Sequence, residues 1–389
     1  MENKKHILFI SSWYPSRQDP THGIFNRFTA EAAALYNKVS VIHVCADENL
    51  KTEFECRQST ENNILTVIFY YKKVKSIFPF SLFLRRSRVL KAFDLAYATL
   101  FKKETKPDLI QLNVIMPMGI GVYHLSKKHN IPYVIAEHWS GYCKEDGNYK
   151  GFLQQFFTRK IVREAKAIMP TSSYLQEAMQ SHGLEGNYKT VPDVVNIHVF
   201  KPTEKATDST TRLLHISSLN DREKNVSGII RAFGKALQKN PALELNIVGE
   251  GIDKEKYKSL VRELKLEAKV NFKGRIVGEE LVKEINKNDA LIMFSNYETF
   301  CLVLIEAFAC AKPVITSSAG AIKTYMKPEL GIMVEKQNEN QLKAAILDFA
   351  ANNKKYNLNL IRKFAVENYS YEKIGEKLDS IYRSVLMTS

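Results

Sequence analysis

The sequence has few cysteines, and they follow no ligand-binding pattern. Five occur among 389 residues, at positions 45, 56, 143, 301 and 310, and none forms a C-x-x-C pair. An odd, dispersed set predicts neither a disulfide framework nor a zinc site, and it favours a reducing compartment. We expect these cysteines to be small buried apolar residues.

Long apolar runs are also absent. No stretch approaches the ~18 residues of a membrane-spanning helix. The apolar run at residues 7–10 is too short for the core of a signal peptide. These absences predict a cytoplasmic protein that is not integral to a membrane.

Acidic residues are outnumbered. Lys and Arg total 56 against 42 Asp and Glu, which gives a net charge of +14 and suggests an anionic partner such as nucleic acid, anionic lipid or a phosphorylated small molecule. With 45% apolar residues the chain is too hydrophobic to be disordered. Its length predicts two domains.

The usual nucleotide-binding fingerprints are missing. The first expected strand is followed by Ser-Ser-Trp-Tyr-Pro, and Gly249-Glu-Gly251 has Lys254 where a third glycine would stand. Gly119-Ile-Gly121 also lacks the third glycine, and no Walker P-loop occurs. A nicotinamide-dependent dehydrogenase and a P-loop ATPase are therefore both disfavoured.

Short apolar runs alternate with longer amphipathic stretches along the whole chain. This rhythm predicts repeated strand–helix–strand units and hence doubly wound parallel sheets. It breaks between Pro192 and Pro202 and then resumes, so we expect two α/β domains that face each other across a cleft. Strands are expected at residues 7–11, 39–44, 64–70, 109–113, 133–137, 167–170, 189–191, 213–217, 243–249, 270–273, 290–294 and 313–317. A final helix is expected at residues 371–387.

One segment predicts a phosphate site of another kind. After the strand at 290–294, the chain enters an apolar helix near residues 301–303, whose first amides and dipole suit an anion. Glu298 precedes that helix and Glu306 lies about a turn inside it. A carboxylate in such apolar surroundings is costly unless it is hydrogen-bonded, and two ribose hydroxyls would satisfy Glu306. The alternative is a glutamate capped by backbone amides or directed outward.

These two glutamates form an E-x7-E pair that is followed by Pro313. The pattern resembles the signature of the retaining GT-B glycosyltransferases of family 4, the glycosyl transferases group 1. Several other segments resemble family landmarks in the same order, namely Tyr14-Pro with His22-Gly23-Ile-Phe, Glu137-His138, Val191-Pro-Asp-Val-Val-Asn, the basic loop 217–226 and Ile247-Val-Gly-Glu-Gly251 with Val270-Asn-Phe-Lys-Gly274-Arg275.

The resemblance implies a GT-B fold of two Rossmann-like domains. It implies an acceptor domain at 1–195, with helix 371–389 crossing back to it, and a nucleotide-sugar domain at 196–370. The reaction would be metal-independent transfer from a UDP- or GDP-sugar with retention of configuration, the donor being a substrate rather than a cofactor. The resemblance assigns catalytic roles to Glu298, Lys224, Arg222 and His138, and donor contacts to Glu306, Phe300, Cys301, Leu302, Arg275, Ser218, Gly249 and Gly23.

The sequence departs from the family pattern at several of these positions. Ser218 stands in place of an arginine for which Arg222 could substitute, and Thr299 and Cys301 replace glycines. Where the family usually has V-P-N-G, this chain has Val191-Pro-Asp193-Val194. Where the family has G-x-P, this chain has Ala311-Lys-Pro313. No residue plainly supplies the carboxylate nucleophile of a double displacement. The resemblance suggests front-face substitution, with His138 contacting the sugar or serving only the structure.

Residues 69–93 contain seven basic residues, no acid and many aromatic and aliphatic side chains. Such a stretch could bind an anionic membrane surface, cover an ordinary core, or bind nucleic acid, although no nucleic-acid motif supports the last. The leading hypothesis is a peripheral enzyme on the inner face of a bacterial membrane that elongates a lipid-linked saccharide for surface polysaccharide or lipopolysaccharide. The alternatives are a GT-B enzyme for a soluble acceptor and a non-catalytic sugar-nucleotide-binding scaffold.

Overall fold

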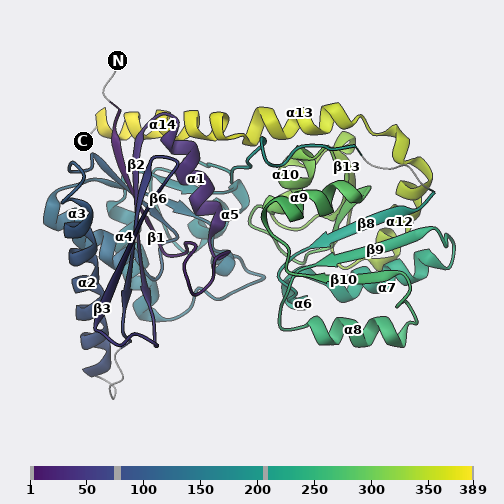
Figure 1. The fold of residues 1–389 in the computed structure, drawn as a ribbon, viewed down its shortest axis with the longest axis horizontal. Coiled ribbons are helices and arrows are strands. Elements are labelled where there is room, and N and C mark those ends of the chain that lie inside the picture. The colour runs from purple at the N-terminus through teal and green to yellow at the C-terminus, as the bar shows by residue number, and fades with distance from the viewer. Residues whose placement is uncertain (1–3, 74–79, 205–208, 388–389) are drawn as a thin grey trace. The chain divides into compact units, whose positions relative to one another are not determined.

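The computed structural model describes residues 4–73, 80–204 and 209–387, without the side chains of residues 80–85. The chain forms two compact units (Figure 1). Unit 1 comprises Met1–Val194 and Tyr371–Ser389, and unit 2 comprises Val195–Ser370. Each unit is an α/β domain built on one mainly parallel sheet, as the sequence rhythm predicts. No helix in the described ranges is long and apolar enough to cross a membrane.

The sheet of unit 1 has seven strands in the order β3-β4-β2-β1-β5-β6-β7. All neighbours are parallel except β3, which runs antiparallel to β4. The strands are β1 (His6–Ser11), β2 (Lys38–Ala46), β3 (Phe54–Glu61), β4 (Ile64–Tyr71), β5 (Leu109–Asn113), β6 (Tyr133–Glu137) and β7 (Ile168–Pro170). Every residue of the central strand β1 is buried, because helices cover both faces of the sheet.

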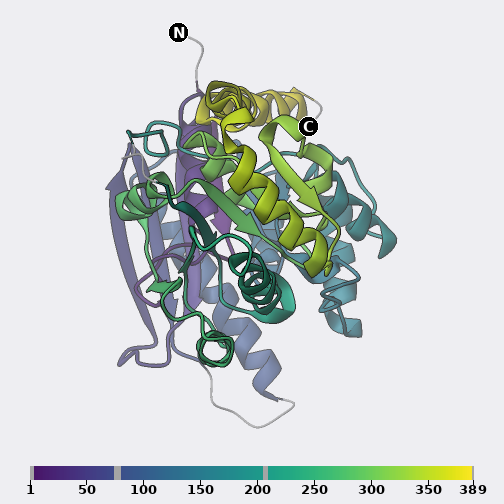
Figure 2. The same cartoon turned by 90° about the vertical axis from the view of Figure 1, so that its right-hand side faces the viewer.

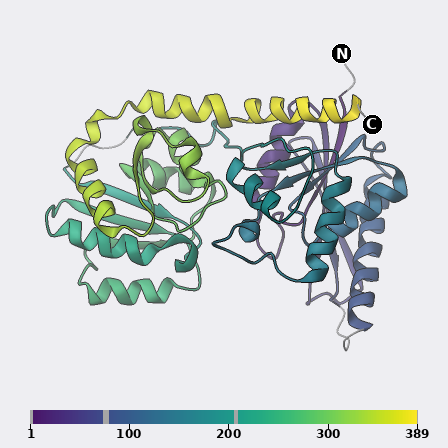
Figure 3. The same cartoon turned by 180° about the vertical axis from the view of Figure 1, so that it is seen from behind.

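The helices of unit 1 divide between the two faces of this sheet (Figures 1 and 3). α1 (Ile24–Ala34) and α14 (Tyr371–Met387) share one hydrophobic core, and α2 (Phe80–Leu100), α3 (Gly119–His129) and α4 (Phe152–Glu164) contribute to the other, together with α5 (Ser173–Ser181). α1 and α14 touch closely, since a Cβ added to Gly375 would lie 2.3 Å from the carbonyl oxygen of Ala32.

The sheet of unit 2 is parallel throughout, in the order β10-β9-β8-β11-β12-β13 (Figure 2). Its strands are β8 (Thr211–Ile216), β9 (Leu243–Val248), β10 (Val270–Gly274), β11 (Ala290–Met293), β12 (Val314–Ser317) and β13 (Gly331–Val334). Its helices are α6 (Asp221–Lys224), α7 (Val226–Leu237), α8 (Lys254–Glu263), α9 (Gly278–Lys287), α10 (Leu302–Ala309), α11 (Ile322–Tyr325), α12 (Glu339–Asn352) and α13 (Leu358–Tyr369).

Each sheet has one topological switch point, where two neighbouring strands are followed by connections that run in opposite directions along the sheet. In unit 2 the chain runs outward from β8 to β10 and then returns to start again at β11, so β8 and β11 are neighbours. In unit 1 the same reversal makes β1 and β5 neighbours. Ligands of open α/β sheets bind outside the carboxyl ends of the strands at such a point.

The expected parallel strands are present with small shifts at their ends, except the one at 189–191. That segment forms a single bridge from Tyr188 to Ile168, because Pro170 has no amide with which to continue the ladder. Two strands were not predicted. β3 is largely exposed and polar, so it carries no apolar signal, and β13 has four residues.

Candidate functional site

The switch point of unit 2 brings together two of the predicted catalytic residues. Lys224 ends the short helix α6, which follows β8, and Glu298 lies in the loop between β11 and α10. Lys224 Nζ donates a hydrogen bond of 2.8 Å to Glu298 Oε1, and the two side chains are 17% and 8% exposed. The Glu298 carboxylate raises the pKa of Lys224 against the opposing effect of burial. Lys224 therefore keeps its charge beside Glu298 although the pair is largely desolvated.

Hydroxyl and amide groups hold this pair in place. Ser295 Oγ donates to the same Glu298 oxygen at 2.7 Å, and Ser317 Oγ at the end of β12 donates to the carbonyl of Ser295. Asn296 links the loop to α6, because its backbone amide donates to the Glu223 carbonyl and its side chain to that of Arg222. The sequence reasoning missed these supporting residues, whose small polar side chains have no distinctive spacing.

The loop ends at the N-terminus of α10. Cys301, the N-cap residue, has φ 74° and ψ 65°, a left-handed conformation that favours glycine. This explains why the family pattern has glycine there, and the conformation is kept although the residue has changed. In the described part of the chain, the amides of Leu302 and Val303 have no protein acceptor. They form the kind of helix terminus that binds anions.

Glu306 lies in the second turn of α10, half-buried among apolar residues. Its carboxylate has no hydrogen bond or ion pair with the residues that the structure describes. Burial raises its pKa to about 8. The group is thus an unsatisfied acceptor on the same helix as the anion site, as expected of a residue that waits for ligand hydroxyls.

Arg222, which was predicted to be catalytic, and the remaining predicted donor residues of unit 2 lie at the carboxyl ends of neighbouring strands. Ser218 and Arg222 follow β8, Gly249 follows β9 and Arg275 follows β10. Gly249 cannot carry a side chain, because a Cβ there would lie 1.9 Å from the Ser217 carbonyl oxygen. Phe300 is buried, and its carbonyl accepts a 2.6 Å bond from Tyr325.

Gly23 and His138 both lie in unit 1, where Phe25 links the segment after Gly23 to the histidine. Gly23 has φ 69° and packs on Trp13, where an added Cβ would lie 2.4 Å from backbone atoms. Phe25, in the following first turn of α1, places its ring 4.6 Å from that of His138. His138 directly follows β6, and the buried Glu137 carboxylate accepts bonds from the amides of Ile115, His138 and Trp139.

His138 also faces an acid. Its Nδ1 lies 3.0 Å from Asp193 Oδ1, although the two are not aligned as a hydrogen bond, and both side chains are nearly buried. Its other ring nitrogen, Nε2, is buried and has no partner among the described residues. The arrangement can orient the ring and present Nε2 to a ligand. Asp193 stands where the family pattern has asparagine, which was the available sequence signal for this contact.

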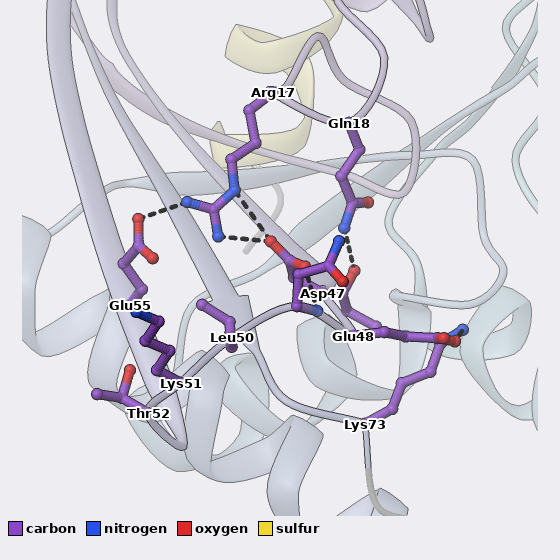
Figure 4. Close-up of a pocket in the computed structure, with 11 residues that line it drawn as sticks. Arg17, Gln18, Asp47, Glu48, Leu50, Lys51, Thr52, Glu55 and Lys73 are labelled. Atoms are coloured by element: carbon purple, nitrogen blue, oxygen red, sulfur yellow. Dashed lines mark hydrogen bonds and ion pairs between the residues drawn. The ribbon is translucent and has the colours of Figure 1, made fainter.

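A wide polar hollow of about 1020 Å³ lies at the carboxyl edge of the sheet in unit 1 (Figure 4). Arg17 from the loop after β1, Asp47 at the end of β2 and Lys73 after β4 line it. The Arg17 guanidinium binds Asp47 and Glu55 and lies 3.9 Å from the centre of the Tyr70 ring. The sequence reasoning did not identify this hollow.

The basic stretch 69–93 differs from the expectation in two respects. Phe69, Tyr70 and Phe93 are core residues rather than exposed rings. Acids from elsewhere in the chain pair with some of its basic groups, since Lys73 binds Glu48, and both Arg88 and Lys91 bind Glu53. Lys75, Ile77 and Phe78 lie outside the described residues, as do the side chains of residues 80–85.

Comparison with known proteins agrees with this architecture. The chain is 30% identical over 166 residues to an uncharacterized glycosyltransferase of Methanocaldococcus jannaschii, covering 41% of this chain and 42% of that protein. It is 29% identical over 203 residues to the N-acetylgalactosamine-N,N'-diacetylbacillosaminyl-diphospho-undecaprenol 4-alpha-N-acetylgalactosaminyltransferase of Campylobacter jejuni, covering 50% and 53%. The matched region thus spans about half the length of these relatives.

A solved structure extends the likeness in fold to the whole chain. The sucrose-phosphate synthase of Thermosynechococcus elongatus superposes with a TM-score of 0.78 at 21% identity, covering 99% of this chain and 100% of that one. Two family models match consecutive segments, "Glycosyltransferase Family 4" at residues 28–199 and "Glycosyl transferases group 1" at residues 200–382. The chain therefore belongs to the family 4 glycosyltransferases of the GT-B type.

Proposed function

We propose that this enzyme transfers a sugar from a UDP- or GDP-sugar to a lipid-linked saccharide with retention of configuration. The observation that carries the proposal is the Lys224–Glu298 pair at the switch point of unit 2, next to the N-terminus of α10. We place the acceptor in unit 1 and the reaction at the inner face of the membrane, in surface polysaccharide or lipopolysaccharide synthesis. The Campylobacter relative, whose name specifies a diphospho-undecaprenol acceptor, supports this choice.

The donor contacts follow from the charges of unit 2. The diphosphate would lie against the free amides of Leu302 and Val303, with Glu306 accepting the ribose hydroxyls. One of the three N–H groups of the Lys224 ammonium donates a hydrogen bond to Glu298, and the other two can donate to phosphate oxygens. An ionised carboxylate has acceptor sites beyond those that Lys224 and Ser295 occupy, so Glu298 can also bind sugar hydroxyls.

The same groups would act on the departing diphosphate. As the bond between the anomeric carbon and the phosphate oxygen breaks, negative charge grows on the phosphate. Lys224 and the helix N-terminus are already oriented toward that charge, which lowers the barrier by electrostatic stabilisation. On the front-face route, the leaving phosphate oxygen accepts the proton of the attacking acceptor hydroxyl. His138 Nε2 would position the transferred sugar.

The first test is thermal stabilisation of the full chain by UDP-, GDP-, ADP- and CMP-sugars without added metal. A ligand that binds the folded state raises the melting temperature as its concentration increases. We expect a UDP- or GDP-sugar to respond and its transfer product to keep the donor's anomeric configuration by NMR. Inversion would contradict the mechanism. The absence of any response at millimolar ligand would contradict the proposed donor site. Stabilisation by a sugar nucleotide without transfer to any acceptor would favour the non-catalytic scaffold, and transfer to free sugars alone would favour a soluble acceptor.

Asp193 provides a test of the role of His138. We expect Asp193→Asn to lower kcat about tenfold and His138→Ala about a hundredfold, because the first loosens the ring and the second removes it. Donor affinity, measured by the same thermal shift, should change little. The double variant should be no slower than His138→Ala alone, since Asp193 acts through the histidine. Additive losses would show that Asp193 acts independently.

A further inference from the structure

The first two turns of α4 expose three large apolar side chains. Phe152, Leu153 and Phe156 are 81%, 59% and 52% exposed, and the two phenylalanine rings stack with their centroids 6.4 Å apart. The opposite side of α4 already supplies Thr158, Ile161 and Val162 to the interior of unit 1. Core packing therefore does not account for the three exposed side chains, and a cluster of this kind indicates an interaction surface.

Positive charge surrounds this cluster. From residue 147 to residue 163 the sequence has four basic residues and no acid. Arg159, Lys160 and Arg163 are exposed on the later turns of α4, and none of them has an ion pair within 4 Å in the described ranges. The neighbouring acid, Glu164, pairs with Lys127, while Lys160 lies over the Tyr123 ring and Arg159 donates to the His182 carbonyl. This differs from stretch 69–93, where Glu48 and Glu53 compensate Lys73, Arg88 and Lys91.

One contact joins the two basic regions. The Arg86 guanidinium of α2 lies 5.2 Å from the centre of the Phe157 ring of α4. Arg86 is exposed, so it extends the basic surface from α4 onto α2. Figure 3 shows these two helices with α3 on one face of unit 1.

We propose that Phe152, Leu153 and Phe156 insert into the headgroup region of an anionic bilayer while Arg159, Lys160, Arg163 and Arg86 bind its headgroups. An apolar cluster beside exposed basic residues that outnumber the neighbouring acids has the chemistry of an interfacial membrane anchor. A second copy of the chain fits this surface less well, because a two-fold contact would bring like charges together. The inference rests on the lipid-linked acceptor of the proposed function and names the surface that reaches the membrane.

Vesicle co-sedimentation of the full chain tests this proposal. We expect binding to vesicles of phosphatidylcholine with phosphatidylglycerol and about tenfold weaker binding to phosphatidylcholine alone. The triple variant Phe152→Ser/Leu153→Ser/Phe156→Ser should lose at least about tenfold in binding. The matched control is Ile252→Ser/Leu358→Ser, which makes the same kind of change at exposed sites in unit 2 and should bind like the parent.

The charges are tested in the same way. Arg159→Glu/Lys160→Glu/Arg163→Glu should abolish binding to the anionic vesicles, whereas Lys239→Glu/Lys265→Glu/Lys354→Glu, an equal charge change at exposed sites of unit 2, should retain most of it. Phe152→Trp should be quenched by brominated lipid, and Ile252→Trp should not. Donor stabilisation and transfer to a soluble acceptor analogue, measured on each variant, should stay at the parental level.

Three results would overturn the inference. One is undiminished vesicle binding by both triple variants. Another is loss of binding on neutralising Lys72, Lys73, Arg85, Arg86 and Arg88 without any effect of the Phe152 triple variant, which would assign the membrane contact to stretch 69–93. The third is a dimer that the apolar triple variant converts to a monomer without a change in vesicle binding. Failure of donor binding or transfer in the parent protein would instead contradict the proposed function.

Discussion

Lys224→Ala should nearly abolish sugar transfer, lowering kcat by about 10²–10³-fold, the size of effect seen when one preorganised charge-stabilising group is removed. Donor affinity should fall less, because Lys224 acts mainly on charge that develops as the phosphate leaves. Steady-state kinetics and donor titration measure the two quantities separately. Equal losses in turnover and donor binding would make Lys224 a uniform binder of ground and transition states.

The stability of this variant needs its own control. Removing Lys224 leaves the Glu298 carboxylate, which is 8% exposed, without its cation. Breaking a buried pair in this way costs about 3–5 kcal/mol. The double variant Lys224→Met/Glu298→Gln removes both charges, so it should recover most of the free energy of unfolding but not the turnover. Recovery of activity in the double variant would mean that the pair serves the fold alone.

Glu306→Ala should weaken nucleotide binding by about 10²-fold, because two hydrogen bonds from ribose hydroxyls to a carboxylate are lost. Isothermal titration with the nucleoside diphosphate measures this change. The 2′-deoxy nucleotide is the matched ligand control. It should bind the parent enzyme more weakly than the ribonucleotide does, and the two should bind Glu306→Ala equally. If the variant still discriminates between them, another group reads the ribose.

The raised pKa of Glu306 adds a pH dependence to this prediction. The free enzyme holds the proton up to about pH 8, whereas hydroxyl donors favour the carboxylate. Nucleotide affinity should therefore rise between pH 7 and pH 8 and then level off, and Glu306→Ala should be flat over that range. The free energy of unfolding of the free protein should change with pH in the opposite direction. It should fall as the pH rises from 4.5, where an unperturbed glutamate titrates, toward 8, because the folded state binds the additional proton there.

The fold was largely predictable because its strands are short buried runs. The period and spacing of apolar residues were enough to predict β1, β5 and β8, because helices cover both faces of these strands. They did not suffice for β3, whose exposed polar residues form a strand because β4 offers an open edge. That cause is a tertiary one and leaves no local signal in the sequence.

The candidate site could be predicted where a residue's type and its surroundings in the sequence point to one chemical role. Glu298 and Glu306 drew attention because carboxylates near an apolar helix have few structural roles, whereas Lys224 was singled out by the family resemblance. The structure brings Lys224 and Glu298 into contact. Contacts between distant segments, such as His138 with Asp193, depend on how the chain returns to the same edge of the sheet. The exposed residues in the first two turns of α4 were missed because the sequence pattern does not distinguish these phenylalanines from core residues.

The close packing of α14 on α1 has a consequence for biosynthesis. Ile374, Leu378, Ile381, Tyr382 and Val385 complete a core whose other buried residues come from the first 194 positions. A ribosome makes all of unit 2 before it makes these five side chains. Unit 1 is therefore completed only after unit 2, and a nascent chain stalled before residue 371 would display an uncovered sheet face to chaperones.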